Sequence, residues 1–115
     1  MTDFLKILAV TVAIDLTYLK LVGEKSFRPA VEAVQGGPMR IRGVAGFAVY
    51  AFIALLLYKF AKTPLNAFLL GLCVYGVFDA TNYAIFSRYP LAVAVQDALW
   101  GGVLFALVRL VVSRA

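Results

Sequence analysis

Three aspartates lie inside long apolar runs of this sequence. Asp15, Asp79 and Asp97 make up half of the six acidic residues of the chain. A carboxylate inside a bilayer costs about 2.5–3.5 kcal/mol on insertion scales, so each of them must face other protein groups or a water-filled cavity. These three residues are therefore the centre of the candidate site.

The three aspartates reach a similar depth if each apolar run forms a helix. Asp15 and Asp79 each lie seven residues before the end of their runs, and Asp97 lies six residues after the start of its run. With a rise of about 1.5 Å per residue, all three lie roughly 10 Å from the same face of the membrane. The spacing therefore predicts one polar layer.

Polar and aromatic residues share helical faces with these aspartates, because positions three and four apart lie on one side of a helix. Their hydroxyl, amide and indole groups could donate hydrogen bonds to the carboxylates. Arg42, at the start of the second apolar run, is the expected counter-ion. The predicted buried layer consists of Asp15, Tyr18, Tyr75, Asp79, Thr81, Asn82, Tyr83, Asp97 and Trp100.

Three interpretations of this layer are open. Its hydrogen bonds could fasten the helices to one another, since intramembrane polar residues often do so. Three close carboxylates in a low dielectric would not all be ionised, so the layer could instead hold a proton or a cation. It could also bind a ligand or a lipid headgroup.

The elements that must position these residues are membrane helices. The chain has 115 residues, of which 63% are hydrophobic and only 15% charged, whereas a soluble domain is about a quarter charged. Four runs of about 20 residues are each long enough to cross a ~30 Å hydrocarbon core. They span residues 4–22, 43–61, 65–86 and 91–112. The sequence thus predicts an all-α, antiparallel four-helix bundle in one domain, 1–115.

The segment 23–42 between the first two runs is too polar to span. Its residues 29–35 alternate apolar and polar groups with helical spacing, which predicts a short interfacial helix that ends at Gly36-Gly37-Pro38. An even number of spans places both termini on one side of the membrane. The basic residues divide almost equally between the two sides, so the positive-inside rule assigns no orientation and the sequence does not identify which membrane is crossed.

Composition and residue types argue against several functions. The basic residues flank the apolar runs or lie in one loop, which suits lipid headgroups and not nucleic acid. The chain contains no histidine, and no serine or cysteine has a neighbouring base, so we expect no enzymatic activity. The acidic residues and Asn82 suggest no dedicated metal site, and we expect no cofactor.

Motifs in three of the runs resemble a known family. They are Asp15-x-x-Tyr18-Leu19, then Tyr75-Gly76-x-x-Asp79-x-Thr81-Asn82-x-Ala84 followed by Pro90, and Asp97-x-x-Trp100-Gly101. The chain resembles the small four-helix membrane proteins grouped as domain of unknown function 2177, with members in bacteria, algae and large DNA viruses. That family commonly has tryptophan at the positions of Tyr18 and Tyr89. The resemblance implies a fold and a site location but no reaction.

Two functions follow from these expectations. Short loops and helix faces of small residues suit a structural or accessory subunit that packs against itself or other subunits in a membrane assembly. By family analogy, the setting would be an organelle membrane or the inner membrane of a virion. The alternative is an oligomeric proton-coupled transporter or channel that uses the layer of Asp15, Asp79 and Asp97.

Overall fold

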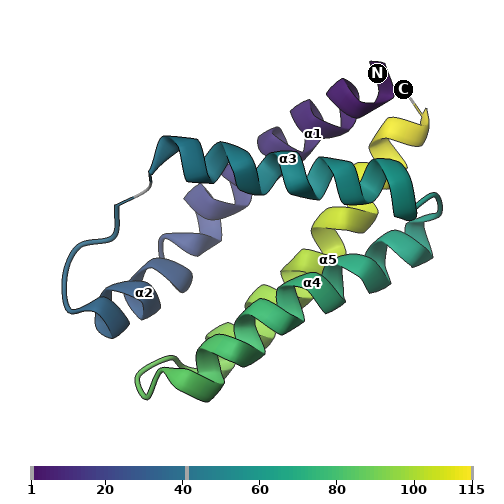
Figure 1. The fold of residues 1–115 in the computed structure, drawn as a ribbon. Coiled ribbons are helices and arrows are strands. Elements are labelled where there is room, and N and C mark those ends of the chain that lie inside the picture. The colour runs from purple at the N-terminus through teal and green to yellow at the C-terminus, as the bar shows by residue number, and fades with distance from the viewer. Residues whose placement is uncertain (1, 41, 115) are drawn as a thin grey trace.

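The computed structural model describes residues 2–40 and 42–114, and the described chain is all-α (Figure 1). Two short helical elements, the π-helical η1 and the α-helical α2, separate α1 from the three long helices. The elements are α1 (Thr2–Tyr18), η1 (Leu19–Gly23), α2 (Phe27–Gln35), α3 (Gly43–Phe60), α4 (Pro64–Ile85) and α5 (Leu91–Arg114). The predicted helices are therefore confirmed, with boundaries that differ by a few residues.

Three of these helices are long and apolar enough to cross a membrane. They are α3, α4 and the Leu91–Val112 part of α5. The first helix is shorter: α1 ends at Tyr18 after 17 residues and carries Asp3, Lys6 and Asp15. The expected four-span bundle is thus reduced to three candidate spans, with α1 continued by η1.

The helix boundaries follow from local sequence. Pro64 occupies the first turn of α4, where no backbone N–H is needed, and Thr63 caps this helix by accepting a hydrogen bond from the Asn66 backbone N–H at 3.2 Å. Pro90 directly precedes α5, and its carbonyl accepts the first bond of that helix, from the Ala94 N–H. Gly36 ends α2 with φ of 74°, a left-handed conformation that glycine adopts without steric cost.

Helices α4 and α5 form a tightly packed antiparallel hairpin, which requires glycine at three positions. A Cβ atom at Gly71 would overlap the carbonyl oxygen of Gly101, and one at Gly101 would overlap the Tyr75 ring. At Gly102 the added atom would lie 2.8 Å from the ring of Phe68. The two backbones therefore approach closely at Gly71 and Gly101, and the rings of Tyr75 and Phe68 pack against the glycines of α5.

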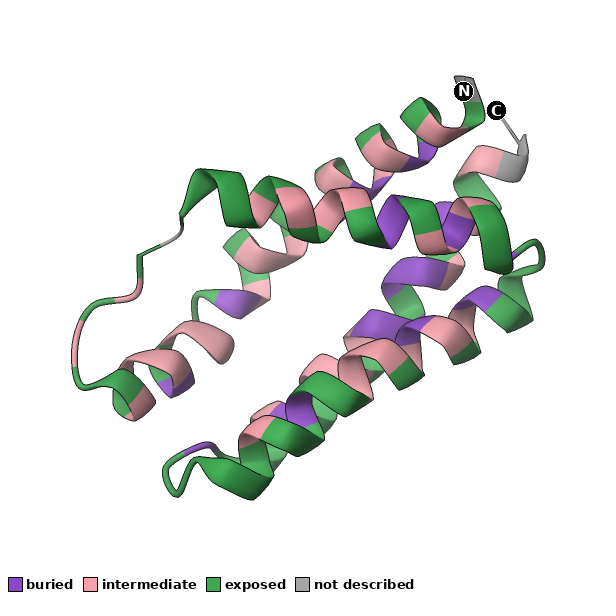
Figure 2. Ribbon diagram, viewed as in Figure 1, coloured by how far each residue is buried: buried purple, intermediate pink, exposed green. Residues whose placement is uncertain are grey.

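The apolar core lies where α1, α3 and α5 meet, at the end of the bundle where α1 begins and α5 ends (Figures 1 and 2). Ile7 of α1, Leu57 of α3 and Phe105 of α5 are fully buried there. By contrast, only Ala67, Gly71 and Asp79 of α4 are buried. Most of α4 therefore faces whatever surrounds the protein.

Candidate functional site

Asp15 is a buried carboxylate with a hydrogen-bond donor on each oxygen. Its side chain belongs to a residue only 7% exposed. Tyr50 Oη donates to Oδ2 at 2.7 Å, and Trp100 Nε1 donates to Oδ1 at 2.9 Å. Since Tyr50 belongs to α3 and Trp100 to α5, this one residue of α1 connects three helices.

The Trp100 donor is held in place by a second aromatic ring. Tyr18 stacks on it with ring centroids 3.9 Å apart and an interplanar angle of 5°. Tyr18 lies one turn after Asp15 on α1, so the same helix supplies both the acceptor for the indole N–H and the surface on which the indole rests. Both residues belong to the predicted layer, and the structure brings them together.

Asp79 is the most deeply buried carboxylate, in a residue 1% exposed. Tyr89, in the connection between α4 and α5, donates its hydroxyl to Asp79 Oδ1 at 2.8 Å. Asp79 Oδ2 is also buried but has no hydrogen-bond donor. The carboxyl of Asp97, which is half-buried on α5, lies close to Asp79.

The predicted single layer is therefore divided into two groups. Asp15 is bonded to α3 and α5, whereas Asp79 and Asp97 face one another within the α4–α5 hairpin. Among the described residues, no hydrogen bond connects Asp15 to either of the other two carboxylates. The two groups still lie near one another, because Tyr18 and Tyr75 are each within electrostatic range of all three carboxylates.

The remaining predicted layer residues of α4 are packed against α5 or exposed, depending on their position around the helix. Tyr75 packs on Gly101 and meets Phe105 edge to face, with centroids 6.2 Å apart. Asn82 is half-buried within reach of the Tyr89 hydroxyl. Thr81 and Tyr83 are instead exposed, unlike the expected buried layer, because their positions turn them away from α5.

Arg42 does not serve as the expected counter-ion. It is exposed just before α3, and no basic side chain lies within 4.0 Å of Asp15, Asp79 or Asp97 in the described part of the chain. Tyr50, farther along α3, reaches Asp15 instead. Neutral donors thus replace the ion pair.

Two residues of the site, Tyr50 and Tyr89, were missing from the predicted layer. Tyr50 lies seven residues after the start of its span at Gly43, a depth that matches Asp15 seven residues before the end of its own run. That depth match could have identified it. Tyr89 precedes Pro90 and reads as an interfacial aromatic, so only the folded connection reveals its contact with Asp79.

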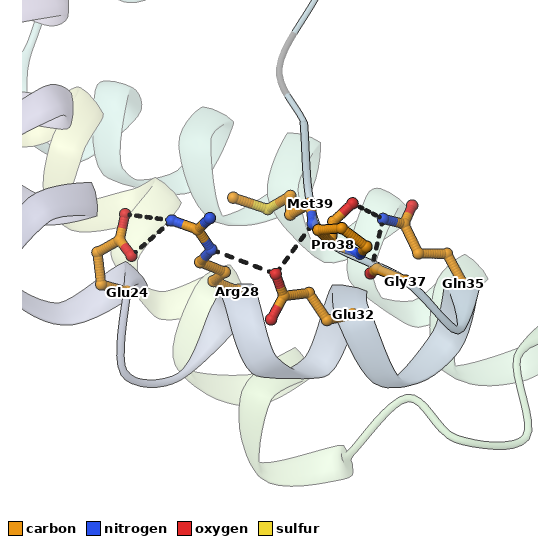
Figure 3. A network of polar contacts seen from close by, with 7 residues as sticks. All are labelled: Glu24, Arg28, Glu32, Gln35, Gly37, Pro38 and Met39. Carbon is orange, nitrogen blue, oxygen red and sulfur yellow. Dashed lines mark hydrogen bonds and ion pairs between the residues drawn. The ribbon is translucent and has the colours of Figure 1, made fainter.

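A separate polar network lies outside the candidate spans, at η1 and α2 (Figure 3). Arg28 pairs with Glu24 at 2.9 Å and with Glu32 at 3.4 Å, and Glu32 accepts a hydrogen bond from the Met39 backbone N–H at 2.9 Å. The Met39 N–H, followed by the charge of Arg28, lowers the pKa of Glu32 below its usual value. The Gln35 side-chain amide donates to the backbone carbonyls of Gly37 and Pro38, so the loop is folded back on α2.

The two carboxylate groups differ in the chemistry open to them. The Asp15 group has every oxygen paired with a neutral donor and can fasten helices. The Asp79–Asp97 pair has an acceptor oxygen without a donor. A proton on either carboxyl would provide an O–H donor between the two groups. No cluster of three or more His, Cys, Asp or Glu side chains suited to a metal ion was found in the residues described.

Comparison with known proteins agrees with this architecture. No curated protein and no solved structure matches the sequence. A family model described as "Predicted membrane protein (DUF2177)" matches residues 1–113, which is nearly the whole chain. The chain therefore belongs to the DUF2177 family of predicted membrane proteins.

Proposed function

We propose that this protein is a non-enzymatic structural or accessory subunit that packs, through α4, against another subunit of a membrane assembly. The observation that carries the proposal is a face of small residues on α4 that no described residue of the chain covers. The assembly would lie in the kind of membrane that the family resemblance implies, that of an organelle or a virion.

The uncovered face consists of Gly76, Ala80 and Ala84, which are spaced by four and share one side of α4. A Cβ atom at Gly76 would meet nothing within 4 Å, and both alanines are exposed. Gly71, on the opposite side of the same helix, is buried against α5. Small residues at such spacing let a second helix approach closely, as the hairpin already does on the inner side.

In this proposal, α1 and η1 together form a fourth span. The helical run from Thr2 to Gly23 is continuous and long enough, at roughly 1.5 Å per residue, to cross the hydrocarbon core. Its one deeply placed charge, Asp15, is bonded to two donors and does not face lipid. Four spans place both termini on one side, in keeping with the start of α1 and the end of α5 lying at one end of the bundle (Figure 1).

The subunit proposal is tested by enlarging the small face. In the full chain isolated from its native membrane in mild detergent, Gly76→Leu/Ala80→Leu should release the co-purifying subunits. The control is Ala45→Leu, which enlarges an exposed residue of α3. A wild-type protein that runs as a stable monomer without a partner, or an assembly unchanged in the double variant, would refute the proposal.

A second candidate function is proton-coupled transport or conduction by an oligomer. It is favoured by the buried Asp79 Oδ2, which has no donor, and by the nearby carboxyl of Asp97, since a proton shared between two carboxyls would form a hydrogen bond. In liposomes carrying a pH gradient, Asp79→Asn should abolish proton-linked flux, since an amide cannot release the proton. Unchanged flux in that variant would exclude this function.

A further inference from the structure

We propose that the surface formed by Tyr58, Lys59 and Lys62 at the carboxyl end of α3 binds the phosphate of an anionic lipid headgroup. The short connection between α3 and α4 joins two candidate spans and therefore lies at a membrane surface. The proposal does not depend on the subunit function. It rests on Lys59, Lys62 and Arg109, which gather at one helix end and form no ion pair within 4.0 Å with a described carboxylate.

Two of the cationic side chains donate hydrogen bonds to carbonyl groups at the end of α3. The last four carbonyl groups of a helix lack intrahelical donors and carry its negative dipole end. Arg109 of α5 donates Nη2 to the Leu57 carbonyl at 2.6 Å, and Lys62 donates Nζ to the Tyr58 carbonyl at 2.6 Å. The geometry of the fold thus fixes positive charge at this point.

The Tyr58 ring gathers the two lysines. The ammonium nitrogens of Lys59 and Lys62 lie 5.8 and 5.3 Å from its centroid, as cation–π contacts. Phe4 of α1 meets the same ring edge to face, with centroids 6.1 Å apart. The ring is therefore held between α1 and the lysines, and both lysines remain exposed.

These cations keep unused donors and have no anionic partner. Each ammonium group has three N–H donors, of which Lys62 uses one on the Tyr58 carbonyl. Among the side chains of residues 3–40 and 42–112, the only ion pairs within 4.0 Å are those of Arg28. At the other membrane face, by contrast, Arg28 is paired with both Glu24 and Glu32.

A phosphodiester at the lipid surface supplies what this cluster lacks. It carries the missing negative charge and accepts several hydrogen bonds, and juxtamembrane lysines are attracted to anionic lipid surfaces. A lipid is the expected source of the phosphate, since the lysines flank two apolar spans along which the acyl chains would lie.

Native mass spectrometry of the full chain in mild detergent tests the proposal by counting bound lipids. Phosphatidylglycerol should bind more tightly than phosphatidylcholine. Lys59→Gln/Lys62→Gln should weaken phosphatidylglycerol binding about 30-fold, while Lys59→Arg/Lys62→Arg should retain it. The charge-matched control Lys20→Gln/Lys25→Gln removes exposed lysines from the opposite end and should leave binding unchanged.

Equal phosphatidylglycerol affinity in the wild type and in Lys59→Gln/Lys62→Gln would overturn the proposal. So would an equal loss in the control variant, because it would show a general charge effect. Inorganic phosphate added in place of lipid should not bind detectably. Binding of inorganic phosphate as tight as that of the lipid would identify free phosphate as the ligand and refute the lipid assignment.

Discussion

Asp15 and Asp79 are carboxylates at similar predicted depth, yet their surroundings are of opposite kinds. Asp15 receives a hydrogen bond on each oxygen, from Tyr50 and Trp100, and these donors come from two other helices. Asp79 receives one, from Tyr89, while its second oxygen has no donor and the acidic side chain of Asp97 lies close by. The comparison teaches that burial of a charge alone does not reveal its role, because the role depends on the donors around it.

The contribution of Asp15 to stability follows from its hydrogen bonds to two other helices. Removing the carboxylate of Asp15 would leave the Tyr50 and Trp100 donors without an acceptor inside the bundle. Unpaired buried polar groups lower the free energy of unfolding. Removing the charge at Asp79 would leave no donor without an acceptor. It would also remove the contact between two acidic side chains. Isosteric substitution by asparagine should therefore act in opposite directions at these two positions.

The largest effect is expected at Asp15. Asp15→Asn replaces one acceptor oxygen by an NH₂ group that faces a donor, so one hydrogen bond becomes a repulsive contact. The free energy of unfolding should fall by about 1–3 kcal/mol, measured by denaturant titration in mixed micelles. An unchanged stability would mean that this carboxylate does not fasten the helices.

A smaller loss is expected when Tyr89 loses its hydroxyl. Tyr89→Phe leaves buried Asp79 without its one described donor, which should lower the free energy of unfolding by about 1–2 kcal/mol in the same titration. Tyr83→Phe is the matched control, because Tyr83 is half-exposed on the same hairpin and should tolerate the change. An equal fall in the free energy of unfolding in the two variants would contradict a stabilising hydrogen bond from Tyr89 to Asp79.

A gain in stability is expected at Asp79. In Asp79→Asn the amide oxygen can still accept from Tyr89, and the new NH₂ group can donate to Asp97. The free energy of unfolding should rise by about 0.5–1.5 kcal/mol. A loss as large as that of Asp15→Asn would place both aspartates in one structural class and would contradict the distinction drawn between them.

The smallest effect is expected at Glu32, a carboxylate outside the candidate spans. Because folding lowers its pKa, its contribution is present above the unfolded pKa and is lost as the pH falls through the lowered folded value. Hydrogen exchange at the Met39 amide should therefore gain an acid-induced opening, beyond the intrinsic pH dependence of exchange. Glu32→Gln should open the loop at neutral pH and leave the stability of the bundle almost unchanged.

Much of the fold is contained in the sequence. Apolar runs of membrane-spanning length, Pro64 and Pro90 at helix starts and Gly36 at a helix end are local signals, and the structure confirms the helices that they predict. Helical spacing also placed Tyr18 on the same face of its helix as Asp15, and the depths of Asp15, Asp79 and Asp97 in their runs predicted one polar layer.

The donors of each carboxylate were decided by the tertiary structure. Spacing along one helix fixes which residues share a face, but not how far a neighbouring helix is rotated or where a connection folds back. For this reason Tyr50, and not Arg42, reaches Asp15, and Tyr89 turns in to Asp79 while Thr81 and Tyr83 remain outside. The sequence by itself determined that carboxylates lie buried in a membrane protein. Only the packing of the helices decided which of them is fully paired and which retains an oxygen without a donor.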